Sequence, residues 1–259
     1  MPPVWDSVQY LRFEAERTRP CLDLISRIEL DAPTRIVDLG CGPGTSSALL
    51  ARRWPEAEVV GVDSSVEMLT AARRAHPSFR WVESDLRTWT PDRPVDLVFS
   101  NAALQWVPDH PREILRLWEE VAAGGALAFQ VPVRGRPVPD WARVYAEVRA
   151  RPYWHTRSGL PPDRSPVLEP GQYFDLLAGT ARRIDLWDTE YSHVLPGPGS
   201  IVEWGRGTAL RPFLESLESE DDRARFLREY LEELERVYPR HHDDAVIFPF
   251  LRRFLVAYR

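Results

Sequence analysis

The residues best suited to binding or chemistry lie in one short stretch, residues 35–46, which reads R-I-V-D-L-G-C-G-P-G-T-S. Its first half is apolar around Ile36, Val37 and Leu39, which is typical of a strand buried in a parallel sheet. Three glycines follow at alternate positions, and the residues after them have a helical pattern. Glycine allows the unusual φ values and the close backbone approach that a ligand requires. The stretch therefore predicts a strand, a ligand-binding turn and a helix whose N–H groups face the ligand.

The spacing of the glycines narrows the class of ligand. The order is D-x-G-x-G-x-G, formed by Asp38, Gly40, Gly42 and Gly44. A dinucleotide site needs glycine at position 45, which is Thr45 here, and a P-loop needs a lysine after its last glycine. The pattern resembles the first motif of class I S-adenosylmethionine (SAM) methyltransferases. That resemblance implies that the turn faces the amino-acid part of SAM and that the acid helps to hold its ammonium group; a turn without a ligand is the alternative.

Three more polar residues follow predicted strands, namely Asp63, Asp85 and Asn101. Ligands of open α/β sheets bind at the carboxyl ends of the strands, so we expect all three to share one edge with Asp38. Asp63 follows Gly40 at about the separation expected of a carboxylate that accepts hydrogen bonds from ribose hydroxyls. Asp85 either accepts a hydrogen bond from an adenine amine or caps its own turn.

The remaining elements follow from periodicity and capping. Predicted strands occupy 36–39, 57–62, 79–82, 95–99, 126–131, 182–195 and 248–258, and predicted helices occupy 7–19, 20–28, 46–54, 111–121, 140–149, 172–179 and much of 197–238. Pro20 is expected to begin the second helix, and Ser64 to form a capping box with Glu67 before Met68, which either faces the ligand or packs.

This alternation predicts an α/β fold, a doubly wound Rossmann-like sheet that is mostly parallel. The last two long strands are expected to form an antiparallel edge, and the helices between them a cap. We expect a single methyltransferase domain over 1–259. Its parts are an N-terminal flap (1–30), a SAM-binding half (31–133), cap segments (134–180 and 196–245) and edge strands (181–195 and 246–259).

Composition excludes several functions. The 259 residues include no lysine, which rules out Schiff-base and pyridoxal phosphate chemistry. A net charge of −6 argues against nucleic acid as a partner, and the sequence has no apolar run long enough to cross a membrane. The two cysteines support neither a disulfide framework nor a metal site. We therefore expect a cytoplasmic monomer that binds no metal.

The sequence has no obvious catalytic acid, base or nucleophile, and methyl transfer to an acid would explain this. A sulfonium methyl group is already electrophilic, and a carboxylate is ionised at neutral pH without a base. The protein then needs only to place the two reactants in line and exclude water. We expect no catalytic residue in the strict sense.

Seven motifs support a specific resemblance. They lie at 5–20 (W-x-x-x-x-Y-L-x-F-x-x-E-R-x-R-P), 38–44 (D-L-G-C-G-P-G), 63–65 (D-S-S), 101–110 (N-A-x-L-Q-W-x-P-D-H), 173–177 (Y-x-D-x-L), 191–193 (Y-x-H) and 204–212 (W-x-x-x-T-x-L-R-P). Together they resemble the trans-aconitate methyltransferases, which form a monomethyl ester of a tricarboxylic acid. The chain departs from that family at Arg134, where asparagine is expected, at Ala209, where glycine is usual, and at Phe213, where tryptophan is usual.

The resemblance implies a role for each matching residue. SAM would be held by Asp38, Gly40, Cys41, Gly42, Gly44, Asp63, Ser64, Met68, Asp85, Leu86, Asn101, Ala102 and Gln105. The acid would be bound by Tyr10, Phe13, Arg17, Arg19, Trp106, Gln130, Tyr191, His193, Trp204 and Arg211. Arginine suits this task because its planar fork pairs with a carboxylate through two hydrogen bonds. Three alternatives stay open: methylation of another small acid or natural product, a non-catalytic SAM-binding protein, and a nucleotide-binding oxidoreductase.

Overall fold

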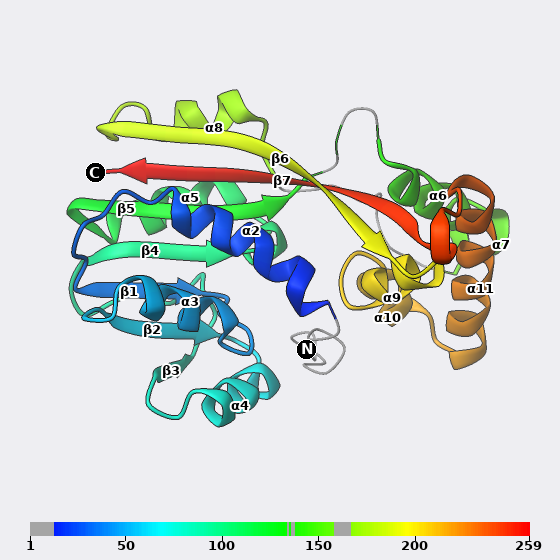
Figure 1. Ribbon diagram of the computed structural model, residues 1–259, viewed down its shortest axis with the longest axis horizontal. Coiled ribbons are helices and arrows are strands. Elements are labelled where there is room, and N and C mark those ends of the chain that lie inside the picture. Colours follow the sequence, from blue (N-terminus) through cyan, green and yellow to red (C-terminus); the bar gives the residue numbers. More distant parts are fainter. Residues whose placement is uncertain (1–12, 134, 136–137, 158–166) are drawn as a thin grey trace. The chain divides into compact units, whose positions relative to one another are not determined.

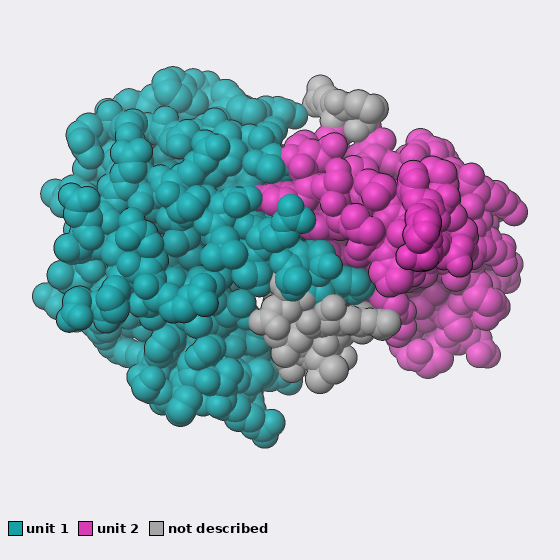
Figure 2. Space-filling view, in the orientation of Figure 1, with its two compact units in different colours: residues 1–133, 165–189, 252–259 teal, residues 134–164, 190–251 magenta. Residues whose placement is uncertain are grey.

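The computed structural model describes residues 13–133, 135, 138–157 and 167–259. The chain divides into two compact units, which are coloured separately in Figure 2. Unit 1 contains 1–133, 165–189 and 252–259, and unit 2 contains 134–164 and 190–251. Two long strands, β6 (Arg183–Leu195) and β7 (Val246–Tyr258), each contribute residues to both units.

Unit 1 is built on a seven-stranded sheet in the order β3-β2-β1-β4-β5-β7-β6 (Figure 1). Its other strands are β1 (Arg35–Leu39), β2 (Glu58–Asp63), β3 (Arg80–Glu83), β4 (Val95–Asn101) and β5 (Val121–Pro132). These five are parallel to one another, whereas β7 is antiparallel to β5. The predicted fold class, a mostly parallel doubly wound sheet with an antiparallel edge, is confirmed.

The strand order places a switch point beside the glycine turn. Chain order runs outward from β1 to β3 on one side and from β4 onward on the other. The loops that follow β1 and β4 therefore diverge and leave a crevice at the carboxyl ends, where ligands of such sheets bind. Burial on both faces explains the apolar runs in the central strands, where Val37, Leu97 and Phe129 are almost fully buried.

Helices cover both faces of this sheet. In unit 1 they are α2 (Glu14–Ser26), α3 (Thr45–Arg53), α4 (Val66–Ala75), the short η1 turn (Leu104–Trp106), α5 (His110–Glu119) and α8 (Pro170–Leu177). In Figure 1, α2 and α3 cross the near face, and α5 lies behind the sheet. None of the helices within the described ranges is both long enough and apolar enough to cross a membrane.

Unit 2 is mainly helical. Its elements are α6 (Asp140–Arg149), α7 (Pro152–His155), α9 (Gly199–Arg206), α10 (Arg211–Ser216), α11 (Glu220–Val237) and η2 (His242–Asp244). An aromatic cluster forms its core: the Phe226 ring lies 4.4 Å from Phe213 and 5.4 Å from Trp154, centroid to centroid. Phe213, where the resemblance leads us to expect tryptophan, is fully buried there.

Three local predictions were wrong. No helix begins at Pro20, because α2 runs through it; the buried face formed by Cys21, Leu24 and Ile25 offsets the lost backbone hydrogen bond. Helix α4 is capped by Ser65, whose hydroxyl accepts a hydrogen bond from Met68 N, and not by Ser64.

The third error concerns the start of β5. The strand begins at Val121 and passes through the glycine pair that was expected to precede it. Its pairing with β4 shifts register between Val95 and Leu97, and Gly124 adopts φ +80°. A glycine with positive φ allows this bulge, so the strand continues through a sequence that looks like a turn.

Candidate active site

The glycine turn has the backbone conformation that its sequence predicts. Gly40, Gly42 and Gly44 have φ values of +71°, +56° and +93°, all in the left-handed region that favours glycine. A Cβ on Gly40 would lie 2.2 Å from the Cβ of Ala103, so this position also requires the absence of a side chain. Gly44 is the N-cap of α3, which begins at the edge of the turn.

Asp38 is a fully buried carboxyl group with one satisfied oxygen. Its Oδ2 accepts hydrogen bonds of 2.6 Å from the hydroxyls of Ser46 and Ser47 in the first turn of α3. Its Oδ1 is buried and has no hydrogen-bond partner among the described residues. Burial raises the pKa of Asp38 to about 6, although the two serine hydrogen bonds act in the opposite direction. Such a group is suited to a ligand that brings a donor or a positive charge.

Asp63 lies on the other side of the turn, at the end of β2. Its Oδ2 accepts a hydrogen bond of 2.9 Å from Gly42 N, and its Oδ1 accepts one of 2.9 Å from Ser65 N. A carboxylate can accept about four hydrogen bonds, so each oxygen retains capacity for a ligand hydroxyl. Burial raises the pKa of Asp63. The site thus brings two partly desolvated acids close to one glycine turn.

Helix α2 contributes to the same place. A hollow at the turn is lined by Arg17, Thr18, Cys21, Gly40, Cys41, Pro43, Thr45, Ser46 and Asn101. Arg17 is almost fully buried there, and Phe13, one helical turn earlier, is also buried. Arg19 is exposed on the same helix. Tyr10, the other aromatic residue predicted in the flap, lies outside the described residues.

The contacts of Asp85 are with its own turn and give no sign of a ligand. Its carboxylate accepts hydrogen bonds from the backbone N and the guanidinium of Arg87, at 2.9 Å to Arg87 N. This pairing lowers the pKa of Asp85. Leu86 packs against the core, and its carbonyl accepts a 2.6 Å hydrogen bond from Arg116. The turn-capping alternative for Asp85 is therefore present, and its predicted role toward adenine stays a prediction.

Asn101 and Gln130 form a pair at the carboxyl ends of β4 and β5. Gln130 Nε2 donates a 2.6 Å hydrogen bond to Asn101 Oδ1, and Gln130 Oε1 accepts one of 3.4 Å from Arg252 on β7. Asn101 also lines the hollow beside the glycine turn. A residue predicted on the cofactor side is thus bonded to one predicted on the substrate side.

The turn after β4 carries the other predicted residues of this edge. Ala102 has φ +57°, which is unusual for a residue other than glycine. Gln105 Nε2 donates a 2.6 Å hydrogen bond to Ala102 O, and Gln105 Oε1 is buried without a hydrogen-bond partner among the described residues. Trp106 is 43% exposed, a large fraction for tryptophan. At the start of α4, Met68 is buried and Ser64 is exposed.

The remaining substrate-side predictions fall in unit 2. Tyr191, His193 and Trp204 come together there: the His193 ring lies 6.0 Å from Tyr191 and 5.2 Å from Trp204, centroid to centroid. All three are buried. Arg211 begins α10 and donates a 2.7 Å hydrogen bond to Glu215. The three aromatic groups therefore form one cluster, and their role toward the acid stays a prediction.

Sequence reasoning missed several residues at this edge. Ser46 and Ser47 bind Asp38, and their position directly after the glycine turn is a local signal for such a role. Arg252 binds Gln130, and the only hint was a pair of arginines inside an apolar strand. Cys21 and Thr18 line the hollow without any pattern that sets them apart from the rest of α2.

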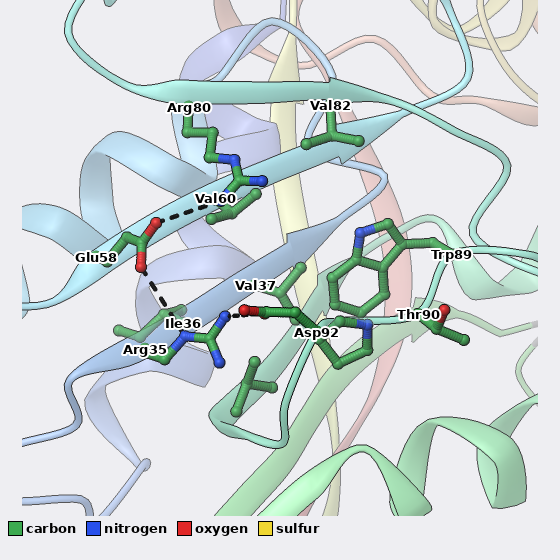
Figure 3. Close-up of a pocket in the computed structure, with 12 residues that line it drawn as sticks. Arg35, Ile36, Val37, Glu58, Val60, Arg80, Val82, Trp89, Thr90 and Asp92 are labelled. Carbon is green, nitrogen blue, oxygen red and sulfur yellow. Dashed lines mark hydrogen bonds and ion pairs between the residues drawn. The ribbon is translucent and has the colours of Figure 1, made fainter.

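A larger pocket, of about 550 Å³, lies at the opposite edge of the sheet (Figure 3). Its apolar part includes Val37, Val60 and Trp89. Its charged rim is paired internally: Arg35 contacts Asp92 at 2.5 Å and Glu58 at 3.9 Å, and Arg80 contacts Glu58 at 3.6 Å. It lies at the amino ends of β1 and β2, away from the residues singled out above, so we place the candidate site at the glycine turn.

The sheet order, the glycine turn and the acid at the end of β2 define a class I SAM-dependent methyltransferase. Residues 36–125 match the family described as methyltransferase domain. Two solved structures share the fold. Haemonchus contortus phosphoethanolamine N-methyltransferase 2, solved with S-adenosylhomocysteine, has a TM-score of 0.57 and 17% identity over 93% of this chain and 52% of its own. The YcgJ protein of Bacillus subtilis has a TM-score of 0.59 and 13% identity over 93% of this chain and 98% of its own.

Curated relatives resolve the family further. A trans-aconitate 2-methyltransferase of Azoarcus sp. strain BH72 is 45% identical over 99% of this chain and all of its own length. That of Variovorax paradoxus strain S110 is 43% identical over 98% of this chain and 97% of its own. The chain belongs to the trans-aconitate 2-methyltransferase family.

The raised pKa of Asp38 leads to a prediction about pH. The raised pKa means that Asp38 contributes stability when the pH is below the pKa of this carboxyl in the unfolded chain. That contribution is lost as the pH rises through about 6, the pKa of Asp38 in the folded protein. A cationic ligand favours the ionised form, so we expect SAM to bind more weakly as the pH falls through about 6. The loss approaches tenfold per pH unit. Calorimetric titration with SAM between about pH 5 and about pH 8 tests this; a constant affinity would contradict it.

Proposed function

We propose that this protein transfers the methyl group of SAM to one carboxylate of trans-aconitate and so forms a monomethyl ester. Membership of the family supports the reaction, and one observation on the site supports the cofactor: the buried Oδ1 of Asp38, which accepts no hydrogen bond from the residues that the structure describes, beside the partly desolvated Asp63. Two such acids favour a cationic ligand. When bound, SAM supplies an electrophilic methyl group on a sulfonium.

The residues of the turn fit the parts of SAM. Asp38 Oδ1 is suited to accept a hydrogen bond from the ligand's ammonium group, and the bare backbone of Gly40 and Gly42 allows the amino-acid part to approach closely. Asp63 keeps acceptor capacity on both oxygens for the two ribose hydroxyls. Arg17, which lines the hollow, is suited to pair with a carboxylate of the substrate acid at this end of the site.

Within this proposal the protein itself moves no proton. The attacking carboxylate is already ionised at neutral pH, so no general base is needed. The chain must bind and orient both reactants and exclude water. Gln105 and Trp106 would separate cofactor from acid, and Arg211 with Tyr191, His193 and Trp204 would bind the acid.

A methyl-transfer panel tests the proposal. The full chain is incubated with SAM carrying a labelled methyl group and, separately, with trans-aconitate, cis-aconitate, isopropylmalate and aromatic acids; ester and S-adenosylhomocysteine are measured together. We expect trans-aconitate to give the highest kcat/KM. A higher kcat/KM for another acid would contradict trans-aconitate as the substrate and would leave the reaction, carboxylate methylation, unchanged. SAM binding without any ester would favour the non-catalytic alternative.

We also propose a cytoplasmic monomer without a nucleic acid partner. The net charge of −6 supports the lack of a nucleic acid partner, because a polyanion requires a basic face, and the two free, buried cysteines support the location, because free thiols persist in a reducing compartment. Light scattering after size-exclusion chromatography measures the oligomeric state. A mass of two or more chains would contradict it.

A further inference from the structure

Two residues of the motifs singled out in the sequence, His110 and Tyr173, have no role in the site as described so far. They are 63 residues apart in the sequence, and a hydrogen bond joins them in the structure. The two rings meet edge to face at 5.6 Å, and His110 Nε2 lies 2.6 Å from the Tyr173 hydroxyl. Both side chains are fully buried in unit 1.

The direction of each hydrogen bond in this pair follows from its partners. His110 Nδ1 lies 2.8 Å from Leu104 O, and a carbonyl can only accept, so Nδ1 carries the proton. Burial lowers the pKa of His110 and favours the neutral ring. Nε2 is then an acceptor, and the Tyr173 hydroxyl donates to it. The Tyr173 oxygen in turn accepts a 3.4 Å hydrogen bond from Leu168 N.

This chain of hydrogen bonds ends on the turn that carries Gln105 and Trp106. Leu104, whose carbonyl accepts a hydrogen bond from His110, lies in that turn and is the first residue of η1. The turn contains Ala102 at φ +57°, and strained backbone of this kind persists only where the surrounding structure determines it. It also carries the buried Gln105 Oε1, which has no hydrogen-bond partner among the described residues.

The far end of the chain is anchored as well. Leu168 O accepts a 2.6 Å hydrogen bond from Arg253 Nη1, and Arg253 forms two hydrogen bonds with Asp188, at 2.9 and 2.8 Å. Arg253 follows Arg252, which reaches Gln130. The antiparallel edge of the sheet is therefore linked to the turn after β4 through Tyr173 and His110.

We propose that His110 and Tyr173 act as a positioning pair that holds the turn from Ala102 to Trp106 in the conformation that methyl transfer needs. Neither residue touches the reacting atoms; each acts through Leu104 and the turn. The proposal rests on the proposed function, because it assigns Gln105 and Trp106 to the boundary between SAM and the acid.

The test uses the full chain with Tyr173→Phe, His110→Leu and His110→Gln. Glutamine can still donate to Leu104 O and accept from Tyr173, so His110→Gln is the conservative variant. The matched control is Tyr258→Phe. Tyr258 is equally buried in unit 1, and its hydroxyl accepts from Glu29 N and donates to Arg27 O, far from the turn in sequence and at the opposite edge of the sheet.

Three measurements are made on each variant: hydrogen exchange of amides 101–108, SAM affinity by calorimetry, and kcat and KM for the acid. In Tyr173→Phe and His110→Leu we expect exchange in 101–108 to rise about tenfold because one buried polar partner is lost, while β1 and residues 95–100 of β4 stay protected. We expect kcat/KM to fall by about tenfold to a hundredfold, with a higher KM and weaker SAM binding. His110→Gln should recover part of the protection in 101–108 and part of kcat/KM.

A purely structural role would give a different result. Loss of folded enzyme lowers kcat alone, and Tyr258→Phe should lower stability without changing KM or exchange in 101–108. Unchanged hydrogen exchange in the turn would overturn the proposal that His110 and Tyr173 position it. Equal losses of kcat/KM in Tyr173→Phe and Tyr258→Phe would overturn it as well. If the unmodified chain esterifies no acid, the proposed function fails, but exchange and SAM affinity still decide the pair. If Tyr173→Phe does not fold, His110→Gln and His110→Leu supply the comparison.

Discussion

Replacing Asp38 with asparagine is expected to weaken SAM binding more than a hundredfold and, at the same time, to stabilise the ligand-free protein at neutral pH. The first effect follows because removing one partner of a buried charge pair costs about 3–5 kcal/mol. The second follows because burial raises the pKa of Asp38 from 3.8 to about 6, so ionisation of this group at neutral pH opposes folding. The free energy of unfolding should rise by up to about 3 kcal/mol.

Calorimetry with SAM and urea unfolding at about pH 7 and about pH 5 measure the two effects. The gain in stability should be largest at the higher pH, where the unmodified group is ionised. Asp96→Asn is the control: Asp96 accepts three hydrogen bonds from Thr34 and Arg35 at the amino edge of the sheet. It should destabilise the fold and leave SAM affinity unchanged. Asp38→Asn with normal SAM affinity would remove Asp38 from the cofactor site.

Gly40→Ala is expected to abolish measurable SAM binding and to destabilise the fold. Alanine at this position would have to adopt the φ of +71° that Gly40 has, and its Cβ would lie 2.2 Å from the Ala103 Cβ. The left-handed conformation costs about 1–2 kcal/mol for alanine, and overpacking adds about 1–3 kcal/mol. Because Ala103 belongs to the turn that carries Gln105, relief of the overlap displaces both sides of the crevice.

Gly124→Ala separates strain from crowding. Gly124 has φ +80°, yet nothing lies within 4 Å of its added Cβ, and it lies on β5 near the amino edge. The Gly124→Ala variant should lose about 1–2 kcal/mol of unfolding free energy, the cost of the left-handed backbone conformation for alanine, and keep full SAM affinity. Urea unfolding and calorimetry on both variants give the comparison. Equal effects of the two substitutions on SAM binding would show that the contact with Ala103 has no part in the site.

The sequence alone determined the parts of this protein that depend on local pattern. The strand, glycine turn and helix at 35–53 are found where periodicity and the positive-φ glycines predict them, and the cofactor class follows from the spacing of Asp38, Gly40, Gly42 and Gly44. The same holds for the strand ends that carry Asp63 and Asn101. These features depend on backbone conformations and side-chain alternation within a few residues, which a sequence displays directly.

Local pattern failed where packing overrides propensity. Pro20 signals a helix start, but α2 continues through it because its buried face is worth more than one lost hydrogen bond. Gly124 signals a connection, but β5 incorporates it as a bulge because β4 and β7 pair on either side. Propensity is a weak prior, and the neighbours that outweigh it are far away in sequence.

Only the tertiary structure decided which polar groups meet. Ser46 and Ser47 on Asp38, Arg252 on Gln130, Arg87 on Asp85 and Tyr173 on His110 were not predicted. Most of these pairs join residues from different strands and helices, and their distances depend on sheet order and register. A polar side chain shows in sequence that it needs a partner when buried, but not which partner it finds. The sequence thus determined the chemistry on offer at the crevice, and the fold determined the contacts that hold it in place.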